Sequence, residues 1–151
     1  MNKKKNILLI VDFVLMLVFV VLDQFTKYLA VYYLKEMPPI ELIKGVFELN
    51  YLENRGAAFG LLQDQKIFFV LIAVVILTAI VYVLLKTPYQ KMYFKLHITL
   101  VLIASGAVGN MIDRIRHDYV VDFLYFSLIN FPIFNVADIY VTLSSFFLVI
   151  L

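Results

Sequence analysis

The chain has 151 residues, a formal net charge of +2 at pH 7 and no cysteine. Its hydrophobic content of 64% and its mean hydropathy of +0.94 exceed the apolar share of soluble domains, which is about 45–50%. This excess predicts one integral membrane domain over residues 1–151, with room for about four spans of roughly 20 residues and none for a second, soluble domain. The lack of cysteine excludes disulfides and thiolate chemistry, and the small net charge argues against nucleic-acid binding.

The first expected span covers residues 13–34 and is mostly apolar, although Asp23 and Lys27 interrupt it. These two residues are four apart and therefore share one face of a helix. A signal peptide is not expected here, because the apolar run is too long and no small-x-small cleavage site follows it. The second expected span, residues 67–85, contains no charge and is typical of a transmembrane helix.

The third expected span covers residues 96–112, where Ser105 and Gly109 form a small-xxx-small pair. Such a pair lets a second helix approach closely. The fourth expected span covers residues 131–151, with Pro132 at a position where a helix start tolerates proline. The predicted fold is therefore an all-α membrane protein with four transmembrane helices.

The distribution of lysine predicts the orientation of these spans. Three lysines lie within the first five residues, and three more lie between the second and third spans: Lys86, Lys91 and Lys95. Positive charge concentrates on the cytoplasmic side, so we expect both termini and this connection to lie in the cytoplasm. The connections at residues 35–66 and 113–130 are poorer in lysine and arginine and are expected to face outward.

The first outer connection carries a strand signal. Apolar and polar side chains mostly alternate over residues 45–53, residues 54–56 are typical of a turn, and residues 57–62 could return as a second strand. The sequence therefore predicts a small extracytoplasmic β-hairpin or sheet on the outer membrane surface.

Four aspartates lie in or beside the expected spans: Asp23, Asp113, Asp122 and Asp138. A charge near the bilayer centre costs at least about 2.5–3.5 kcal/mol, so each such residue needs a partner or a function. Asp113 and Asp122 follow the third span, and Asp138 lies about seven residues, or roughly 10 Å, into the fourth. Because the third span runs outward and the fourth runs inward, these three acids can meet in the outer leaflet.

Each of these residues also has a structural interpretation. Asp23 and Lys27 can form an ion pair that holds the first span to its neighbours, and Asp113 can form a salt bridge with Arg114 or cap a helix. Asp122 and Asp138 have no nearby cation in the sequence and are the better catalytic candidates. Two carboxyl groups held together in a medium of low dielectric constant share one proton, as in aspartic proteases.

The residues alone leave other functions open. The same acids could carry protons in a small proton-coupled transporter, or the chain could be a non-enzymatic membrane scaffold. A zinc protease is not expected, because the only histidines, His97 and His117, do not form an H-E-x-x-H motif. Both histidines are expected to lie at the membrane interfaces.

Five short motifs occur in order along the chain: Asp23-Gln-Phe-Thr-Lys27, Asn54-Arg-Gly-Ala-Ala-Phe-Gly60, Gly109-Asn-Met-Ile-Asp-Arg114, Val120-Val-Asp-Phe123 and Phe134-Asn-Val-Ala-Asp138. With these motifs, on spans of this topology, the chain resembles lipoprotein signal peptidase, also called signal peptidase II. An intramembrane protease of the presenilin or prepilin type would be expected to contain Gly-x-Gly-Asp, which is absent from this sequence.

The resemblance implies an aspartic endopeptidase that cuts the signal peptide from bacterial prolipoproteins, immediately before a diacylglyceryl-modified cysteine, without metal or cofactor. It implies a multi-pass protein of the bacterial plasma membrane with its active site toward the extracytoplasmic side, in contact with lipids and blocked by globomycin-like inhibitors. It also places the catalytic dyad on Asp122 and Asp138. The residues that it implies shape the site or bind substrate are Asp23, Lys27, Asn54, Gly56, Asn110, Asp113, Arg114 and Asn135.

Overall fold

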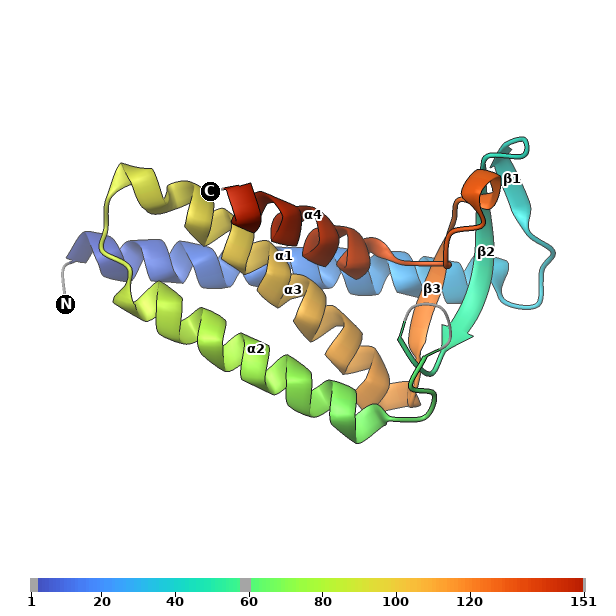
Figure 1. Ribbon diagram of the computed structural model, residues 1–151, viewed down its shortest axis with the longest axis horizontal. Coiled ribbons are helices and arrows are strands. Elements are labelled where there is room, and N and C mark those ends of the chain that lie inside the picture. The colour runs from blue at the N-terminus through green and yellow to red at the C-terminus, as the bar shows by residue number, and fades with distance from the viewer. Residues whose placement is uncertain (1–2, 58–60, 151) are drawn as a thin grey trace.

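The computed structural model describes residues 3–57 and 61–150. Within these residues the chain forms four α-helices and one three-stranded sheet. The helices are α1 (Lys3–Leu34), α2 (Lys66–Lys86), α3 (Phe94–His117) and α4 (Val136–Ile150), and two single 3₁₀ turns accompany them, η2 (Lys91–Tyr93) and η3 (Ser127–Ile129). The helices run lengthwise, the sheet closes one end of the bundle, and both ends of the chain lie toward the other end (Figure 1).

The outer surface of the bundle is apolar, as the composition predicts. Helices α1, α2 and α3 are long and apolar enough to cross a membrane, whereas α4 is a shorter apolar helix. Large side chains such as Ile67, Val75 and Phe146 are more than half exposed. An apolar surface of this extent requires a lipid environment, so the fold is that of a mostly helical membrane protein.

The structure corrects the predicted limits of two spans. Helix α3 continues to His117, so Asp113 lies inside the helix and not after it. Helix α4 begins at Val136, which makes Asp138 a residue of the first helical turn. The prediction that Asp138 lies about seven residues into its helix was therefore wrong.

The late start of α4 has a local cause. The side chain of Asn135 accepts a hydrogen bond from the backbone N–H of Asp138 (3.0 Å), and the Asp138 carboxylate accepts one from the backbone N–H of Asn135 (3.1 Å). This reciprocal pair is a capping box, which stabilises a helix end at that residue. Pro132 lies in the extended segment before it and does not begin the helix.

The sheet has the order β1-β2-β3 and is antiparallel throughout, with β1 at Ile40–Ile43, β2 at Phe47–Asn54 and β3 at Val120–Tyr125. The expected hairpin exists, but the partner of β2 precedes it in the sequence. The prediction of a returning strand over residues 57–62 lies partly outside the described residues, at 58–60, and residues 61–62 form a turn. Strand β3 comes from the connection between α3 and α4, a pairing that local periodicity does not reveal.

Helix α3 packs against the other three helices, and small residues allow the close approach. Ser105 is fully buried, which confirms its role in packing. A methyl group added at Gly106 would lie 2.5 Å from the carbonyl oxygen of Ala137, and one added at Gly109 would collide with the carboxylate of Asp23. The predicted small-xxx-small surface therefore brings both α1 and α4 against α3.

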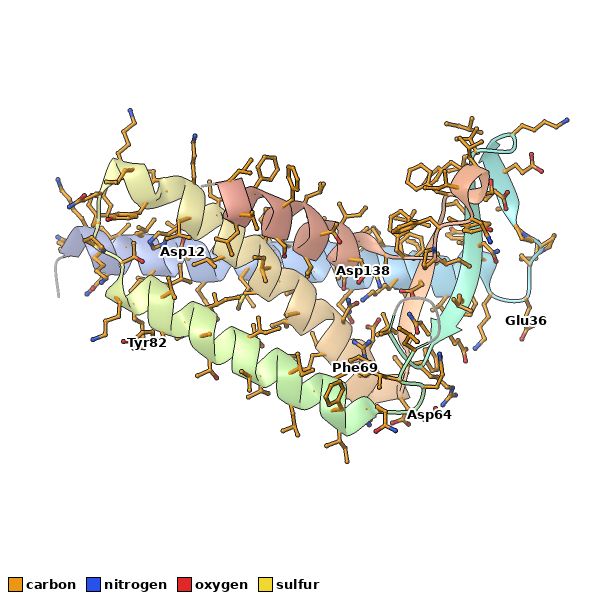
Figure 2. All side chains as sticks on the ribbon, in the orientation of Figure 1. Asp12, Glu36, Asp64, Phe69, Tyr82 and Asp138 are labelled. Atoms are coloured by element: carbon orange, nitrogen blue, oxygen red, sulfur yellow. The ribbon has the colours of Figure 1, made fainter. Side chains whose placement is uncertain are left out.

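A buried polar pair joins α1 to α3 in the half of the bundle that lies away from the sheet. His97 is 2% exposed, and its Nδ1 lies 2.6 Å from the carboxylate of Asp12. Asp12 and Asp138 lie toward opposite ends of the bundle (Figure 2). The ring is enclosed between these two helices. The expectation that His97 lies at the membrane interface stays a prediction.

We expect Asp12→Ala to lower the free energy of unfolding in detergent by about 1–3 kcal/mol, because it leaves the buried His97 ring without its partner. Asp12→Asn retains an amide oxygen at the same position and is the matched control, with a smaller loss. Circular dichroism during denaturant titration measures both. Equal stability of Asp12→Ala and the wild type would contradict a structural role for the pair.

Candidate active site

A cavity of about 590 Å³ lies where the C-terminal end of α3 and the N-terminal end of α4 meet β3. Asp122 and Asp138 both line it, together with Asn54, Asn110 and Arg114. Most of the remaining wall is apolar and comes from α4 and from the segment between β3 and α4, including Phe126, Ile129, Phe131, Ile133, Phe134, Ile139 and Leu143. The site therefore combines two carboxyl groups with an apolar chamber.

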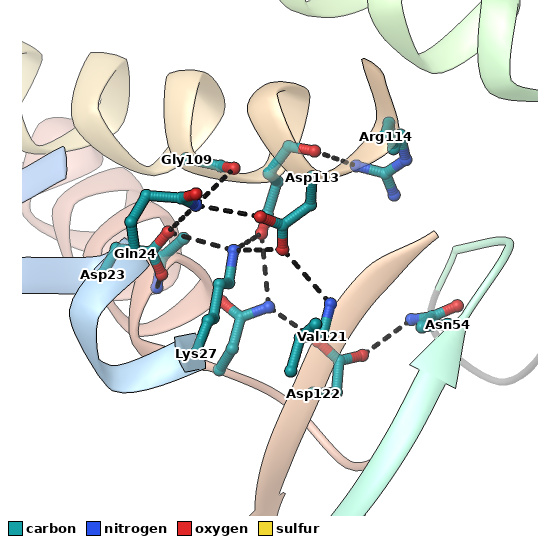
Figure 3. Close-up of polar contacts among 12 residues, drawn as sticks. Asp23, Gln24, Lys27, Asn54, Gly109, Asp113, Arg114, Val121 and Asp122 are labelled. Atoms are coloured by element: carbon teal, nitrogen blue, oxygen red, sulfur yellow. Dashed lines mark hydrogen bonds and ion pairs between the residues drawn. The ribbon is translucent and has the colours of Figure 1, made fainter. Parts of the chain in front are cut away.

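Asp122 reaches the cavity from the middle of β3. Asp122 is only 1% exposed and is among the most deeply buried residues of the described chain. One carboxylate oxygen accepts a hydrogen bond from the Asn135 amide (2.6 Å), and the other accepts one from the Asn54 amide (2.9 Å). Strand β2 and the cap of α4 thus fix this carboxyl group from two directions (Figure 3).

Asp138 reaches the cavity from the first turn of α4 and is only half-buried. Its Oδ1 accepts a hydrogen bond from the Asn110 amide (2.8 Å), and its Oδ2 accepts the capping bond from the backbone of Asn135. Asn135 therefore contacts both carboxyl groups, Asp122 through its side chain and Asp138 through its backbone. This shared residue sets the relative placement of the two acids.

The electrostatics separate the two acids. Burial of its carboxyl group and the charge of nearby Asp138 raise the pKa of Asp122 to about 7, although the amide donors of Asn54 and Asn135 oppose the rise. At neutral pH the pair can therefore hold one proton on Asp122. One neutral and one ionised carboxyl group facing the same cavity can act as acid and base.

Behind the cavity, Lys27 forms the centre of a buried ionic cluster. Its ammonium lies 3.0 Å from Asp23 and 2.9 Å from Asp113, and it donates a hydrogen bond of 2.9 Å to the Asn110 side chain. The predicted ion pair between Asp23 and Lys27 is confirmed. Asp113 does form a salt bridge, as the sequence analysis allowed, but its partner is Lys27 and not the adjacent Arg114 (Figure 3).

The two supporting acids also hold the backbone beside the cavity acids. Asp23 accepts a hydrogen bond from the N–H of Ala137 (3.0 Å), the residue before Asp138. Asp113 accepts one from the N–H of Val121 (3.2 Å), the residue before Asp122. The ionic cluster therefore fixes the chain immediately before each cavity carboxyl group.

Gln24 belongs to this cluster and was missed in the sequence analysis. Its amide donates to both Asp23 (3.2 Å) and Asp113 (2.9 Å) and to the carbonyl of Gly109 (3.2 Å). The signal was present, since Gln24 lies within the motif that begins at Asp23. An amide next to an aspartate in an expected membrane span is itself a residue that needs a partner.

Arg114 joins the third helix to the loop after β2. It donates a hydrogen bond of 3.1 Å to the carbonyl of Gly56, and its guanidinium lies 4.4 Å from the centre of the Phe69 ring. The N–H of Gly56 donates in turn to the side chain of Asn54 (3.0 Å). A side chain at Gly56 would collide with the carbonyl of Leu61, so only glycine fits this approach.

The structure thus brings together all ten residues that the sequence analysis assigned to the site. Six line the cavity, and the other four, Asp23, Lys27, Asp113 and Asn135, lie behind it or join its parts. Their separate roles in catalysis and binding stay predictions. Among the described residues, no group of three or more histidine, aspartate or glutamate side chains is placed to hold a metal ion.

Comparisons with known proteins agree with this arrangement. A family model described as signal peptidase (SPase) II matches residues 15–151. A lipoprotein signal peptidase of Caldanaerobacter subterraneus subsp. tengcongensis is 47% identical over 130 residues, which cover 85% of this chain and 86% of that protein. The lipoprotein signal peptidase of Clostridium tetani is 41% identical over 143 residues, covering 92% and 90%. A solved structure of a bacterial membrane enzyme shares 32% identity and a TM-score of 0.81, over 93% of this chain and 90% of that one.

We expect Lys27→Met to lower the free energy of unfolding by about 3–5 kcal/mol, because it leaves two buried carboxylates without their cation. Lys66→Met is the control. The ion pair between Lys66 and Asp118 is open to solvent, since the two side chains are 37% and 64% exposed, and such a pair contributes at most about 1 kcal/mol to stability. Denaturant titration in detergent micelles compares the two. Equal losses for both variants would contradict the central role of Lys27.

Proposed function

Because the chain belongs to the signal peptidase (SPase) II family of aspartic peptidases, we propose that it cleaves prolipoproteins immediately before a diacylglyceryl-modified cysteine, with Asp122 and Asp138 as the catalytic dyad. The observation that carries this proposal is the pair of carboxyl groups that Asn135 joins at the wall of an apolar cavity. The apolar wall suits acyl chains and the signal peptide, and globomycin-like inhibitors would occupy the same cavity.

The two acids have different roles in this proposal. Asp138 lies in the first turn of α4 and accepts a hydrogen bond from the N–H of Asn135. It serves as the base that takes a proton from water. Asp122 is almost fully buried, which favours its neutral form, and it serves as the acid.

The proton transfers then balance over one turnover. As Asp138 takes a proton, the water oxygen bonds to the scissile carbonyl carbon and Asp122 gives its proton to the carbonyl oxygen. Collapse of the tetrahedral intermediate breaks the carbon–nitrogen bond, and the proton on Asp138 passes to the amine of the departing cysteine. Asp122 recovers a proton from the intermediate's hydroxyl group, which restores the starting state.

We expect Asp122→Asn and Asp138→Asn each to abolish cleavage of a diacylated prolipoprotein peptide while the protein stays folded. The double variant should lose no more rate than either single variant, because the two acids act as a unit. Single-turnover cleavage of the peptide in detergent micelles measures these rates. Asp118→Asn, which changes a solvent-exposed aspartate, is the control and should cleave at the wild-type rate.

Asp113→Asn provides a second contrast. It weakens the contact with Lys27 but removes no group from the cavity wall, so it should lower stability and leave measurable turnover. Substantial cleavage by Asp122→Asn, together with none by a folded Asp113→Asn, would move the dyad to Asp113 and Asp138.

The pH dependence of cleavage follows from the raised pKa of Asp122. Since Asp122 must be protonated to act as the acid, kcat/KM should fall as the pH rises through about 7. Asn54 donates to the carboxylate and so lowers its pKa. Asn54→Ala removes that donor, raises the pKa of Asp122 and should move the alkaline limb of the kcat/KM profile to higher pH. A limb that moves to lower pH, or stays in place, would contradict this assignment.

The proposed topology places both ends of the chain in the cytoplasm and the sheet outside, in a bacterial plasma membrane. The natural chain has no cysteine, so single cysteines report sidedness directly. In intact cells, an impermeant thiol reagent should label Glu41→Cys on β1 and should label Lys91→Cys, between α2 and α3, only after permeabilisation. The reverse pattern would overturn the positive-inside assignment.

A further inference from the structure

A second chamber, of about 600 Å³, adjoins the cavity that Asp122 and Asp138 line. The two share part of one wall, made by Asn54, Ala57 and residues 131–133. The rest of its wall is richer in polar side chains than that of the first cavity. The neutral ones come from β2, from the loop after it and from the end of β3 and the segment that follows: Asn50, Asn54, Gln63, Tyr125 and Asn130. We call it the amide chamber.

Two charged side chains also lie on the wall of the amide chamber. The carboxylate of Glu53 pairs with Lys35 (3.1 Å) and accepts a hydrogen bond from Tyr51 (3.1 Å). The guanidinium of Arg55 lies over the Tyr119 ring and keeps its positive charge. Neutral hydrogen-bonding groups outnumber these two charged ones, which suits a polar peptide and does not suit acyl chains.

The position of Asp122 fixes how a substrate would run through both chambers. Asn54 belongs to both walls and donates to Asp122, so the scissile bond lies at the junction. The apolar cavity extends along α4, past Ile139 to Leu143, whereas the amide chamber is lined by β2 and the segments beside it. The sheet to which β2 belongs lies at one end of the bundle (Figure 1). A signal peptide and acyl chains need apolar surroundings, while the chain after the cysteine must leave the membrane.

We infer that the amide chamber receives the first residues of the mature lipoprotein, those that follow the lipidated cysteine, and so reads the polarity of that segment. This inference rests on the proposed peptidase function. Arg55 on the wall should make the wild type favour a peptide with glutamate over one with lysine at the second position after the cysteine. A further charge placed in the chamber should shift the ratio of kcat/KM between these two peptides.

The test uses the full chain in detergent micelles and diacylglyceryl peptides that differ only at that second position. Asn50→Asp should favour the lysine peptide and Asn50→Lys the glutamate peptide, each changing the ratio of kcat/KM by about threefold to tenfold, as expected for solvent-accessible charge pairs. Gln65→Asp and Gln65→Lys are matched controls, because Gln65 precedes α2 at the same end of the bundle and lines neither chamber. The controls should keep the wild-type ratio.

A second readout does not depend on turnover. In the Asp138→Asn variant, a photoreactive residue at the second position after the cysteine should cross-link to residues 50–55 or to Gln63. Two outcomes would overturn the inference and leave the peptidase function standing. One is cross-links confined to α4. The other is cleavage whose kcat/KM ratio stays the same whatever the charge at position 50. Failure to cleave any of the peptides would instead refute the proposed function, and the cross-links would still decide where the mature segment lies.

Discussion

The ammonium of Lys27, held between Asp23 and Asp113, is the interaction on which the rest of the site depends. A cation at 3% exposure inside a membrane helix is costly unless it is paired. N–H donors from Gln24, Ala137 and Val121 also bond to the two carboxyl groups. The need to satisfy these buried acids therefore ties α1 and α3 to α4 and β3.

This arrangement also explains why the cavity acids are well placed. Each supporting acid accepts a hydrogen bond from the residue before a cavity acid, and Asn135 then joins the two cavity acids to each other. Side-chain amides of Asn54, Asn110 and Asn135 then hold the carboxyl groups themselves. Backbone and side-chain hydrogen bonds together therefore fix the two cavity acids.

The same cap that positions Asp138 explains one error of the sequence analysis. A proline near residue 131 and an apolar run beyond it are typical of a helix start, so the fourth span was expected to begin there. The helix begins only at Val136, because Asn135 and Asp138 cap it there, and residues 131–134 line the cavity. The reciprocal cap outweighed the local helix signal at this position.

The sequence by itself determined the membrane class, the approximate spans and the pairing of Asp23 with Lys27, because apolar runs and four-residue spacing act through local helix geometry. It also identified the residues that gather at the site, through their motifs. Only the tertiary structure decided that Asp113 turns to Lys27 and not to Arg114, that His97 is buried against Asp12, and that β2 lies between β1 and β3. Most of these contacts join residues about 70–90 positions apart, and the arrangement of whole helices, which no short window of sequence encodes, brings them together.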